Sequence, residues 1–369
     1  EFDHLLLALG SETNFFDLPG VSEWAVTMKR LIDALLLRNR MLALLEEASL
    51  CTDLAARRRV LTFVIAGGGF SGVETTGGVN DFVRDAVRYY PQLTEDMIRV
   101  VIVHAGDALL PELGEKLGHY AEYKLCERKV EVFKRMRVTG YDGSLVTLAN
   151  GTSIPAATLI WTAGIKASPA IAALPCRTVG GRLVVDEFLA VPEHPGLWAV
   201  GDCAAVPIAK TGKSQPPTAQ HGLREAEVAA RNIEAAILGR PLKPFIFTTL
   251  GQLASIGRRT GVAMVFGIKF SGWFAWMLWR TVYLFKLPGL SKKLRVMTGW
   301  TFDLFFPRDL EQILTLRDIE AISDMAARIR ARADAMRKTL PPSTEPHSNS
   351  DGLGDHARLL HPSNPPRQP

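Results

Sequence analysis

A glycine-rich turn directly after a short apolar run constrains this chain more than any other feature. The run covers residues 60–66, is rich in β-branched side chains and predicts a buried strand, and a helical pattern follows the turn. In the spacing Gly-x-Gly-x-x-Gly, the first glycine makes the tight turn, the second lets the backbone approach a pyrophosphate, and the third lets helix and strand pack closely. We therefore predict a dinucleotide site with its diphosphate at the helix N-terminus. Its candidate residues are Gly67, Gly68, Gly69 and Gly72.

Strands and helices alternate around this turn, and hairpin-type turns divide the stretch that follows. The expected elements are, in order, a strand at 1–10, a helix at 21–58, the strand before the turn, a helix at 73–90, a strand at 100–103, a helix at 114–129, three alternating runs at 131–139, 144–149 and 154–163, and later a helix at 218–238. This order predicts a doubly wound α/β domain of the Rossmann type over about residues 55–165.

The end of the second strand bears on the choice of nucleotide. An acidic residue usually stands there and binds the ribose hydroxyls, but this chain has His104. An NADP site is expected to have an arginine nearby, and residues 104–110 contain none, which favours NADH. His104 either donates to a ribose hydroxyl or is a tolerated substitution, and the sequence leaves both interpretations open.

Glu74 follows the third glycine and falls in the first helical turn. One interpretation is a carboxylate that stabilises the helix by about 0.3–1 kcal/mol through its N-terminal dipole. The other is a group beside the nicotinamide and flavin rings that handles protons. An anion beside a diphosphate site carries an electrostatic cost, so the sequence leaves the two interpretations balanced.

Bulk properties exclude several classes of protein. A chain of 369 residues predicts two domains with appendages, and a net charge of +5 does not demand nucleic acid as a partner. The four cysteines are too far apart in sequence for a zinc site or a Cys-x-x-Cys redox centre, and we expect no metal. The chain opens on an apolar strand without Met, so we expect a fragment whose beginning is missing.

A basic, aromatic stretch points to a membrane surface. Residues 235–302 contain no Asp or Glu but carry ten Lys or Arg and four of the seven tryptophans. Only ten residues separate Lys269 from Arg280, too few for a helix that spans a bilayer, so we expect helices lying on its surface. The alternative is a buried aromatic stripe with a solvated basic rim. The expected lipid contacts are Trp273, Trp276, Trp279, Lys286, Lys292, Lys293 and Arg295.

Four motifs together resemble those of the type II NADH:quinone oxidoreductases, which are single-subunit NADH dehydrogenases that do not pump protons. The resemblance covers residues 1 to about 310. The motifs are, in order, Gly67-Gly68-Gly69-Phe70-Ser71-Gly72-Val73-Glu74, Trp161-Thr162-Ala163-Gly164-Ile165-Lys166, Ala199-Val200-Gly201-Asp202-Cys203-Ala204 and Pro217-Thr218-Ala219-Gln220.

The family's fold implies an FAD domain interrupted by an NADH domain, followed by amphipathic membrane-binding helices. The FAD glycine motif of the family lies upstream of anything in this chain, so the N-terminal half of the FAD domain is expected to be incomplete. The expected divisions are 1–50 for the first FAD half and connecting helix, 51–166 for the NADH domain, 167–244 for the second FAD half, 245–310 for the membrane-associating region, 311–340 for a helix and 341–369 for a disordered tail.

The resemblance also implies roles for single residues. Gly201 and Asp202 would meet FAD, although Asp202 is also a candidate helix N-cap. Ala219 and Gln220 would lie beside the isoalloxazine and the quinone entrance, while the plain alternative for Gln220 is an exposed residue in a first helical turn. Glu74 matches a family glutamate near the flavin and, with Gln220, is the catalytic candidate. The other expected cofactor contacts are Gly10, His104, Ala163 and Gly164.

The implied reaction is oxidation of NADH through FAD with two-electron reduction of a membrane quinone and no proton pumping. Such an enzyme would be peripheral to the cytoplasmic face of a bacterial inner membrane, or to a mitochondrial inner membrane, and the resemblance leaves a homodimer open. A soluble flavin disulfide reductase and a non-catalytic, membrane-tethered nucleotide-binding fragment are the alternatives.

Overall fold

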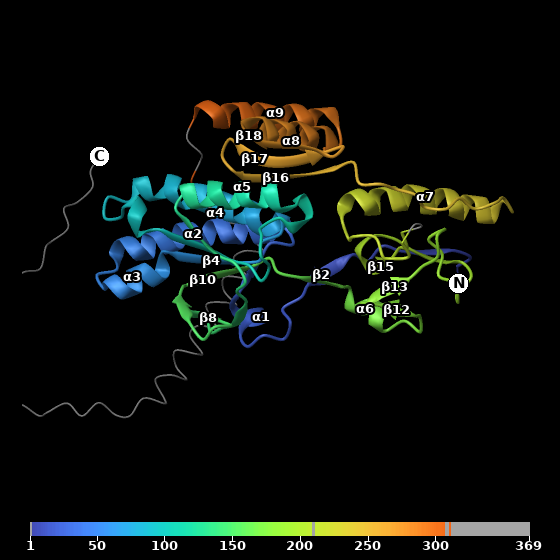
Figure 1. Ribbon diagram of the computed structural model, residues 1–369, viewed down its shortest axis with the longest axis horizontal. Helices are drawn as coiled ribbons and strands as arrows, with labels where there is room; N and C mark the ends of the chain where they lie inside the picture. The colour runs from blue at the N-terminus through green and yellow to red at the C-terminus, as the bar shows by residue number, and fades with distance from the viewer. Residues whose placement is uncertain (1, 209–210, 307–309, 311–369) are drawn as a thin grey trace, which may run out of the picture. The chain divides into compact units, whose positions relative to one another are not determined.

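A five-stranded parallel sheet carries the glycine turn in the computed structural model, which describes residues 2–208, 211–306 and 310. The strand order is β3-β10-β4-β5-β6, so the strand before the turn lies in the centre. The strands are β3 (Val26–Thr27), β10 (Thr158–Trp161), β4 (Thr62–Ala66), β5 (Arg99–Val103) and β6 (Val130–Phe133). The predicted Rossmann-type sheet is confirmed (Figure 1).

Alternation along β4 explains the two layers that cover this sheet. Phe63 and Ile65 point into a core shared with the helices, whereas Val64 and Ala66 point into a second core. The helices are α2 (Leu31–Leu50), α3 (Leu54–Val60), α4 (Phe70–Ala86) and α5 (Glu115–Glu127). The second core is closed by an antiparallel meander of β7 (Val138–Tyr141), β8 (Leu145–Leu148) and β9 (Ser153–Pro155). Both faces of the sheet are therefore buried, as its continuous apolar strands require.

A second group of short strands surrounds the motif at Gly201. β1 (Leu5–Leu7) pairs in parallel with β14 (Leu197–Ala199), and β2 (Ser11–Thr13) pairs with β11 (Ile165–Ala167) in antiparallel fashion. The small sheet β12 (Thr178–Val179), β13 (Arg182–Val184) and β15 (Ala204–Ala205) completes the group, with the short helix α6 (Pro169–Ala172) and the long helix α7 (Ala219–Ile237). The predicted helix at 218–238 is α7.

The basic, aromatic stretch begins with a sheet that the sequence analysis missed. β16 (Gly251–Gly257), β17 (Thr260–Val265) and β18 (Ile268–Gly272) form an antiparallel meander, and α8 (Trp273–Lys286) and α9 (Leu290–Phe305) follow it. Figure 1 shows this meander between α4 and α5 on one side and α8 and α9 on the other. β16 and β17 lie between these layers and lack the regular alternation of apolar and polar residues that marks a half-exposed strand, whereas β18 alternates through Ile268, Lys269, Phe270 and Ser271 and is largely exposed.

Backbone-to-backbone contact joins α4 to β16. A Cβ on Gly77 would lie 2.4 Å from the carbonyl oxygen of Ile256, so only glycine allows this approach. Arg128 reinforces the contact, since it donates to the carbonyl oxygens of Ile256 and Arg258 and pairs with Asp81 at 3.2 Å. The C-terminal meander is therefore fixed directly to the nucleotide-binding helix.

The single helix expected over 21–58 is wrong. A one-turn helix α1 (Val21–Trp24) is followed by β3, and α2 and α3 come next. The Asp33 carboxylate explains the break, because it accepts hydrogen bonds from the backbone N–H groups of Lys29 and Arg30 and from the Thr27 hydroxyl. These bonds satisfy N–H groups at the start of α2 and leave Val26 and Thr27 free to pair with β10.

Two further expectations concern the C-terminal region. In the part of the chain that the structure describes, no helix is long and apolar enough to cross a bilayer. The expected helix at 311–340 and the tail at 341–369 lie outside the described residues.

Two glycines of α4 give a stability test. A Cβ on Gly72 would lie 1.8 Å from the Gly67 carbonyl oxygen, whereas one on Gly78 meets nothing within 4 Å among the described atoms. Gly72→Ala should therefore destabilise the protein by about 1–3 kcal/mol through overpacking. Gly78→Ala should stabilise it by about 1 kcal/mol, since alanine favours a helix. Urea unfolding measures both, and equal effects of the two substitutions would contradict this packing.

Candidate functional site

The strands on either side of β4 hold the glycine turn through Val103 and Ala163. Its first N–H, on Gly67, donates to Val103 of the neighbouring strand at 2.9 Å, and Gly67 has a φ of +117°, which a side chain would strain. A Cβ on Gly67 would also lie 3.0 Å from the Ala163 nitrogen at the end of β10. Ala163 is thus brought to the turn, as expected for a shared site at the carboxyl edge of the sheet, whereas Gly164 packs against Phe16 and Asn14.

The turn is open at Gly69. A Cβ on Gly69 meets nothing within 4 Å in the described ranges, and Gly69 caps α4 without any side-chain hydrogen bond. The first N–H groups of a helix have no partner within the helix, and its dipole favours an anion there. An open glycine before uncapped N–H groups fits the diphosphate of a dinucleotide.

His104 packs beneath the turn. Its Nδ1 accepts a hydrogen bond from the Gly68 N–H at 3.1 Å, and a Cβ on Gly68 would lie 2.5 Å from the ring. Burial lowers the pKa of His104, while the backbone at Ala108 and the Glu112 charge oppose that shift. The neutral ring is therefore favoured, with Nδ1 as acceptor. A hydrogen bond that orders the turn was not among the roles weighed from the sequence.

A second open edge lies at Gly10 and Gly201. They follow the parallel strands β1 and β14, and both have positive φ, +66° and +74°. Within the described part of the chain, a Cβ on either glycine meets nothing within 4 Å. Two adjacent strand ends without side chains leave room for a cofactor against the backbone, as the expected FAD site requires.

Asp202 follows this edge, and one hydroxyl and one ammonium group hold its carboxylate. Its Oδ2 accepts a hydrogen bond from the Ser11 hydroxyl at 2.6 Å and lies 3.7 Å from the Lys29 ammonium, which itself donates to Ser11. Asp202 lies inside the short helix η4 (Gly201–Cys203), whose N-cap is Val200, so it is not the N-cap that the sequence left open. The carboxylate lies beside the open glycines, where it could accept from sugar hydroxyls.

Glu225 supports the same edge and was missed from the sequence. It is 2% exposed on α7, and its Oε2 accepts the Gly201 N–H at 2.7 Å. Burial raises its pKa, and the hydrogen bond from Gly201 opposes that rise. The buried face of α7 consists of His221, Glu225, Ala229 and Asn232, so a charged residue in the helical register of a buried face was the signal.

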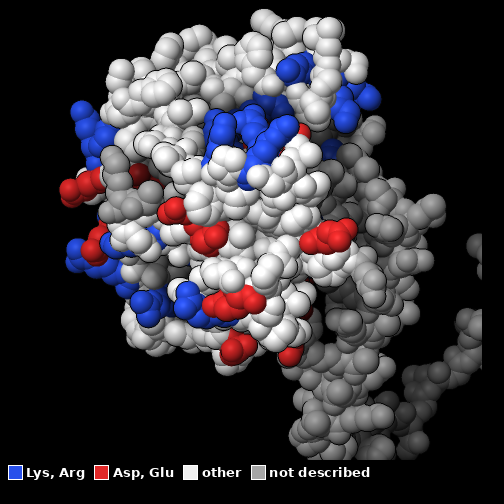
Figure 2. Space-filling model, turned by 90° about the vertical axis from the view of Figure 1, so that its right-hand side faces the viewer, with Lys and Arg blue, Asp and Glu red and all other residues white. Residues whose placement is uncertain are grey.

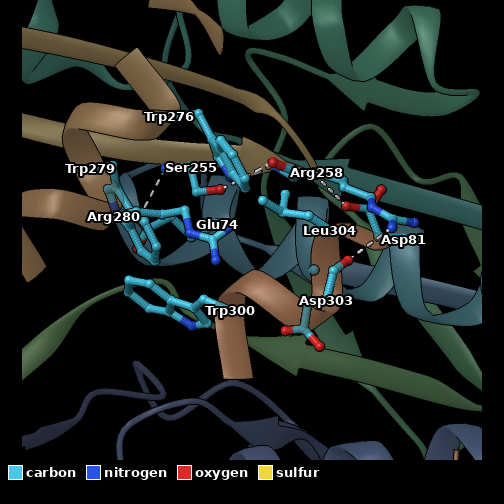
Figure 3. A pocket seen from close by; sticks show the side chains of 12 residues that line it. Glu74, Asp81, Ser255, Arg258, Trp276, Trp279, Arg280, Trp300, Asp303 and Leu304 are labelled. Atoms are coloured by element: carbon cyan, nitrogen blue, oxygen red, sulfur yellow. Dashed lines mark hydrogen bonds between the residues drawn. The ribbon is translucent and has the colours of Figure 1, made fainter. Parts of the chain in front are cut away.

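Glu74 lies where the nucleotide helix meets the C-terminal meander. Its Oε1 accepts the Ser255 N–H at 3.1 Å and the Trp279 indole N–H at 2.9 Å (Figure 3). Burial raises the pKa of Glu74, and the two hydrogen bonds, Ser255 first, lower it. The carboxyl group is consequently fixed in place and favours holding a proton more than an exposed glutamate does.

An aromatic cavity of about 310 Å³ opens beside Glu74 (Figure 3). The guanidinium of Arg280 lies 4.5 Å from the Trp276 ring centre and 4.7 Å from that of Trp300, so it is held between two indoles. Flat aromatic walls and a desolvated cation suit a planar ligand with carbonyl oxygens. The remaining lining includes Gly78, Asp81, Ser255, Gly257, Arg258, Trp279, Asp303 and Leu304.

A second, apolar cavity of about 410 Å³ lies between α2 and α4. Glu74 and Gly78 line both cavities, and the space where a Gly78 side chain would stand is empty of described atoms. The walls of the second cavity include Met28, Leu37, Met41, Val79 and Phe82. Glu74 therefore faces an aromatic cavity on one side and an aliphatic one on the other.

Gln220 approaches the same meander from α7. Its Nε2 donates to the carbonyl oxygen of Gly251 at 3.5 Å, a long hydrogen bond, and the preceding Ala219 is exposed in the first turn of α7. Gly251 and Ser255 are both in β16, four residues apart, or about 13 Å at the rise of a strand. One strand thus touches both of the expected catalytic side chains, Gln220 and Glu74.

The expected lipid contacts need a correction. Trp276 is 7% exposed, and Trp279 is half-buried with its indole bonded to Glu74, so these two rings pack inside the protein. Trp273 is 58% exposed, and α8 turns only this tryptophan of the three outward. The alternative of an aromatic stripe in the core therefore holds for Trp276 and Trp279, because the strands β16, β17 and β18 pack against α8.

Comparisons with known proteins identify the family to which the chain is similar. The chain matches the family model "Pyridine nucleotide-disulphide oxidoreductase" over residues 1–229 and the model "NDH2 C-terminal domain" over residues 250–309. It is 32% identical over 314 residues to the type II NADH:quinone oxidoreductase NdhA of Mycobacterium tuberculosis, covering 81% of this chain and 66% of NdhA. It is 30% identical over 335 residues to Ndh of the same organism, also a type II NADH:quinone oxidoreductase, covering 87% of this chain and 71% of Ndh.

A solved structure shares the fold. NDH2 from Plasmodium falciparum in complex with NADH superposes with a TM-score of 0.77 at 21% identity and covers 84% of this chain and 79% of NDH2. The chain therefore spans about two thirds of the curated relatives' length and most of the fold of this neighbour.

The contact beneath the glycine turn predicts a pH effect. The pKa of His104 is lower in the folded chain than in the unfolded one, so only the unfolded chain takes up this proton just below pH 6.5. The free energy of unfolding should fall as the pH drops from about 6.5 toward the lowered pKa. In His104→Gln, whose amide oxygen can still accept from Gly68, that contribution should vanish. Urea unfolding of both proteins between about pH 8 and pH 5 measures it, and parallel curves would contradict the prediction.

Proposed function

Because the chain belongs to the pyridine nucleotide-disulphide oxidoreductase family and, within it, to the type II NADH:quinone oxidoreductases, we propose that it oxidises NADH through FAD and reduces a membrane quinone without pumping protons. The observation that carries this proposal is the position of Glu74. It follows the dinucleotide turn on α4, and its carboxyl group faces an aromatic cavity built by the C-terminal helices.

The NADH part of the proposal rests on the open side of the turn at Gly69. The diphosphate would accept hydrogen bonds from the uncapped N–H groups of α4, and Gly67, Gly68 and Gly72 keep the turn tight against the sheet. Ala163 would border the same site, with Gly164 next to it in sequence. His104 orders the turn through Gly68, a role that does not itself distinguish NADH from NADPH.

The FAD part rests on the edge at Gly10 and Gly201. Gly201 and Asp202 would bind the ribityl and phosphate region, with Asp202 oriented by Ser11 and Lys29. FAD held at this edge would supply the hydride and electron transfer between NADH and the quinone. We assign residues 1–50 and 167–244 to the FAD part, 51–166 to the NADH part and 245–310 to the membrane-associating part.

The quinone part rests on the cavity beside Glu74. Reduction of a quinone to a quinol takes two electrons and two protons, whereas NADH gives up one hydride, so the site must supply a further proton from solvent. Glu74, whose pKa burial raises, would donate it and be reprotonated from water. The quinone ring would lie against the aromatic lining of this cavity, where Trp276 and Trp300 hold the Arg280 guanidinium between them, and Gln220 would border the flavin side.

The membrane part rests on the outer faces of α8 and α9. Figure 2, in which the end of the molecule that carries α7 faces the viewer, shows Lys and Arg in the upper part and also at the lower left, where Asp and Glu lie among them. The basic residues of α8 and α9 themselves are Arg280, Lys286, Lys292, Lys293 and Arg295. Exposed rings and basic groups in this region would bind anionic lipid and bring the cavity to a bilayer-soluble substrate. The proposed contacts are Trp273, Phe274, Phe285, Leu290, Phe302, Phe305, Lys286, Lys292, Lys293 and Arg295. We place the protein at the cytoplasmic face of a bacterial inner membrane or at a mitochondrial inner membrane.

The activity is tested on the full-length flavoprotein with its membranes. NADH should bleach the flavin absorbance, NADPH should do so more slowly, and a soluble quinone analogue should restore the absorbance. Failure of NADH to bleach the flavin would refute the proposal. Reoxidation by disulfides alone would identify a soluble disulfide reductase, although the four cysteines of this chain are all free.

The lipid surface is tested by vesicle sedimentation. Replacing Trp273, Phe274 and Phe285 together with Ser should weaken binding to anionic vesicles by at least about a hundredfold, given that each buried ring contributes about 1.5–3 kcal/mol. The control replaces three exposed apolar residues far from this region in sequence, Leu54, Tyr89 and Tyr123. If the control variant loses vesicle binding as strongly as the test variant, the surface is wrongly assigned.

A further inference from the structure

We propose that Trp279 is a positioning residue for the reaction: its indole N–H holds the Glu74 carboxyl in the orientation that faces the aromatic cavity. The inference rests on the proposed function of Glu74 as proton donor. Trp279 comes from a different part of the chain, 205 residues after Glu74, and it reaches the same carboxyl oxygen as a backbone N–H of β16.

The hydrogen bonds to Glu74 come from two unlike donors. Ser255 donates through its backbone, whose direction the pairing of β16 with β17 fixes. Trp279 donates through a side chain at 2.9 Å, the shorter of the two bonds. Both converge on Oε1, so the second carboxyl oxygen receives neither of them. A carboxyl group with one oxygen anchored presents the other to the cavity.

Trp279 is itself held on both sides by aromatic rings. Its ring centre lies 4.9 Å from that of Tyr283, one turn further along α8, and 6.2 Å from that of Trp300 on α9. Trp300 in turn lies against the Arg280 guanidinium, whose other face meets Trp276. These contacts fix the indole in one plane, so the direction of its N–H is set by packing before any ligand arrives.

The surroundings of Glu74 determine how strongly the Trp279 N–H affects its pKa. Burial dominates the rise of its pKa, and each N–H donor works against that rise by stabilising the carboxylate. Burial raises the pKa of Tyr283, and the nearby Glu74 charge raises it further. The other charged groups that line the two cavities at Glu74 are Arg38 of α2, Asp81 of α4, Arg258 after β16, Arg280 of α8 and Asp303 of α9.

The test compares Trp279→Phe with the wild type in the full-length flavoenzyme. Phenylalanine keeps an aromatic ring but removes the N–H. The rate of flavin bleaching by NADH should be unchanged, because the NADH turn is untouched. On the alkaline side of the pH profile, kcat for quinone reduction falls; this alkaline limb should move to a pH about one unit higher. The reason is that losing a hydrogen-bond donor to the carboxylate raises the pKa of Glu74.

Two variants separate a hydrogen bond from simple packing. Trp279→His keeps an N–H donor in a smaller ring and should bring the limb back toward the wild-type position. Trp24→Phe makes the same change of side chain on α1, away from the site, and should leave the profile as it is. If Trp279→Phe does not fold, Trp279→His is compared with Trp279→Ala. If the alkaline limb of the pH profile shifts as far in Trp279→His as in Trp279→Ala, the inference is overturned.

Glu74→Gln distinguishes this inference from the function on which it rests. If Glu74→Gln leaves quinone reduction and its pH profile unaltered, Glu74 is not the proton donor and the proposed role fails. If Glu74→Gln removes the alkaline limb but Trp279→Phe leaves it in place, only the positioning role fails. The expected result is that Trp279→Phe shifts the limb in the wild type and has no effect on the pH profile in the Glu74→Gln background.

Discussion

The close approach of backbone to backbone along α4 is the constraint on which the site depends. Gly72 lets the start of the helix meet the Gly67 carbonyl, and Gly77 lets the next turn meet the Ile256 carbonyl of β16. A side chain at either position would push the helix away from a partner by an ångström or more. Glu74 lies between these two contacts in sequence, so its carboxyl is carried to the junction of nucleotide turn and C-terminal meander.

This placement explains how one short helix can serve two purposes. Its free N–H groups favour an anion at the N-terminus, while the next turn presents an acid whose pKa burial raises. The electrostatic cost expected for a carboxylate beside a diphosphate is reduced, because the Glu74 carboxyl points to Ser255 and Trp279. The C-terminal helices thereby provide part of the environment of a residue in the nucleotide domain.

The glycine turn and the parallel sheet were predictable, because they depend on local spacing and on the apolar runs of β4 and β5. Glu74 was expected in the first helical turn, but α4 begins at Phe70 and Glu74 lies beyond that turn. The partners of Glu74 were not predictable, since a hydrogen bond over 205 residues leaves no local pattern. Trp276 and Trp279 were expected at lipid because helical spacing identifies an apolar face but not what covers it. Asp33 broke an expected helix through side-chain bonds to backbone that periodicity does not register.

The strand β16 has a consequence for how such a site can vary. Its Gly251 carbonyl meets Gln220 and its Ser255 N–H meets Glu74, and both contacts use backbone atoms. Neither contact therefore uses a side chain of β16, although Gly251 and Gly257 leave no room for a larger residue. A residue inserted between the two positions would lengthen the separation by about 3.3 Å and reverse the direction of every N–H and carbonyl beyond it. The number of residues between Gly251 and Ser255 is therefore what sets the spacing between Gln220 and Glu74.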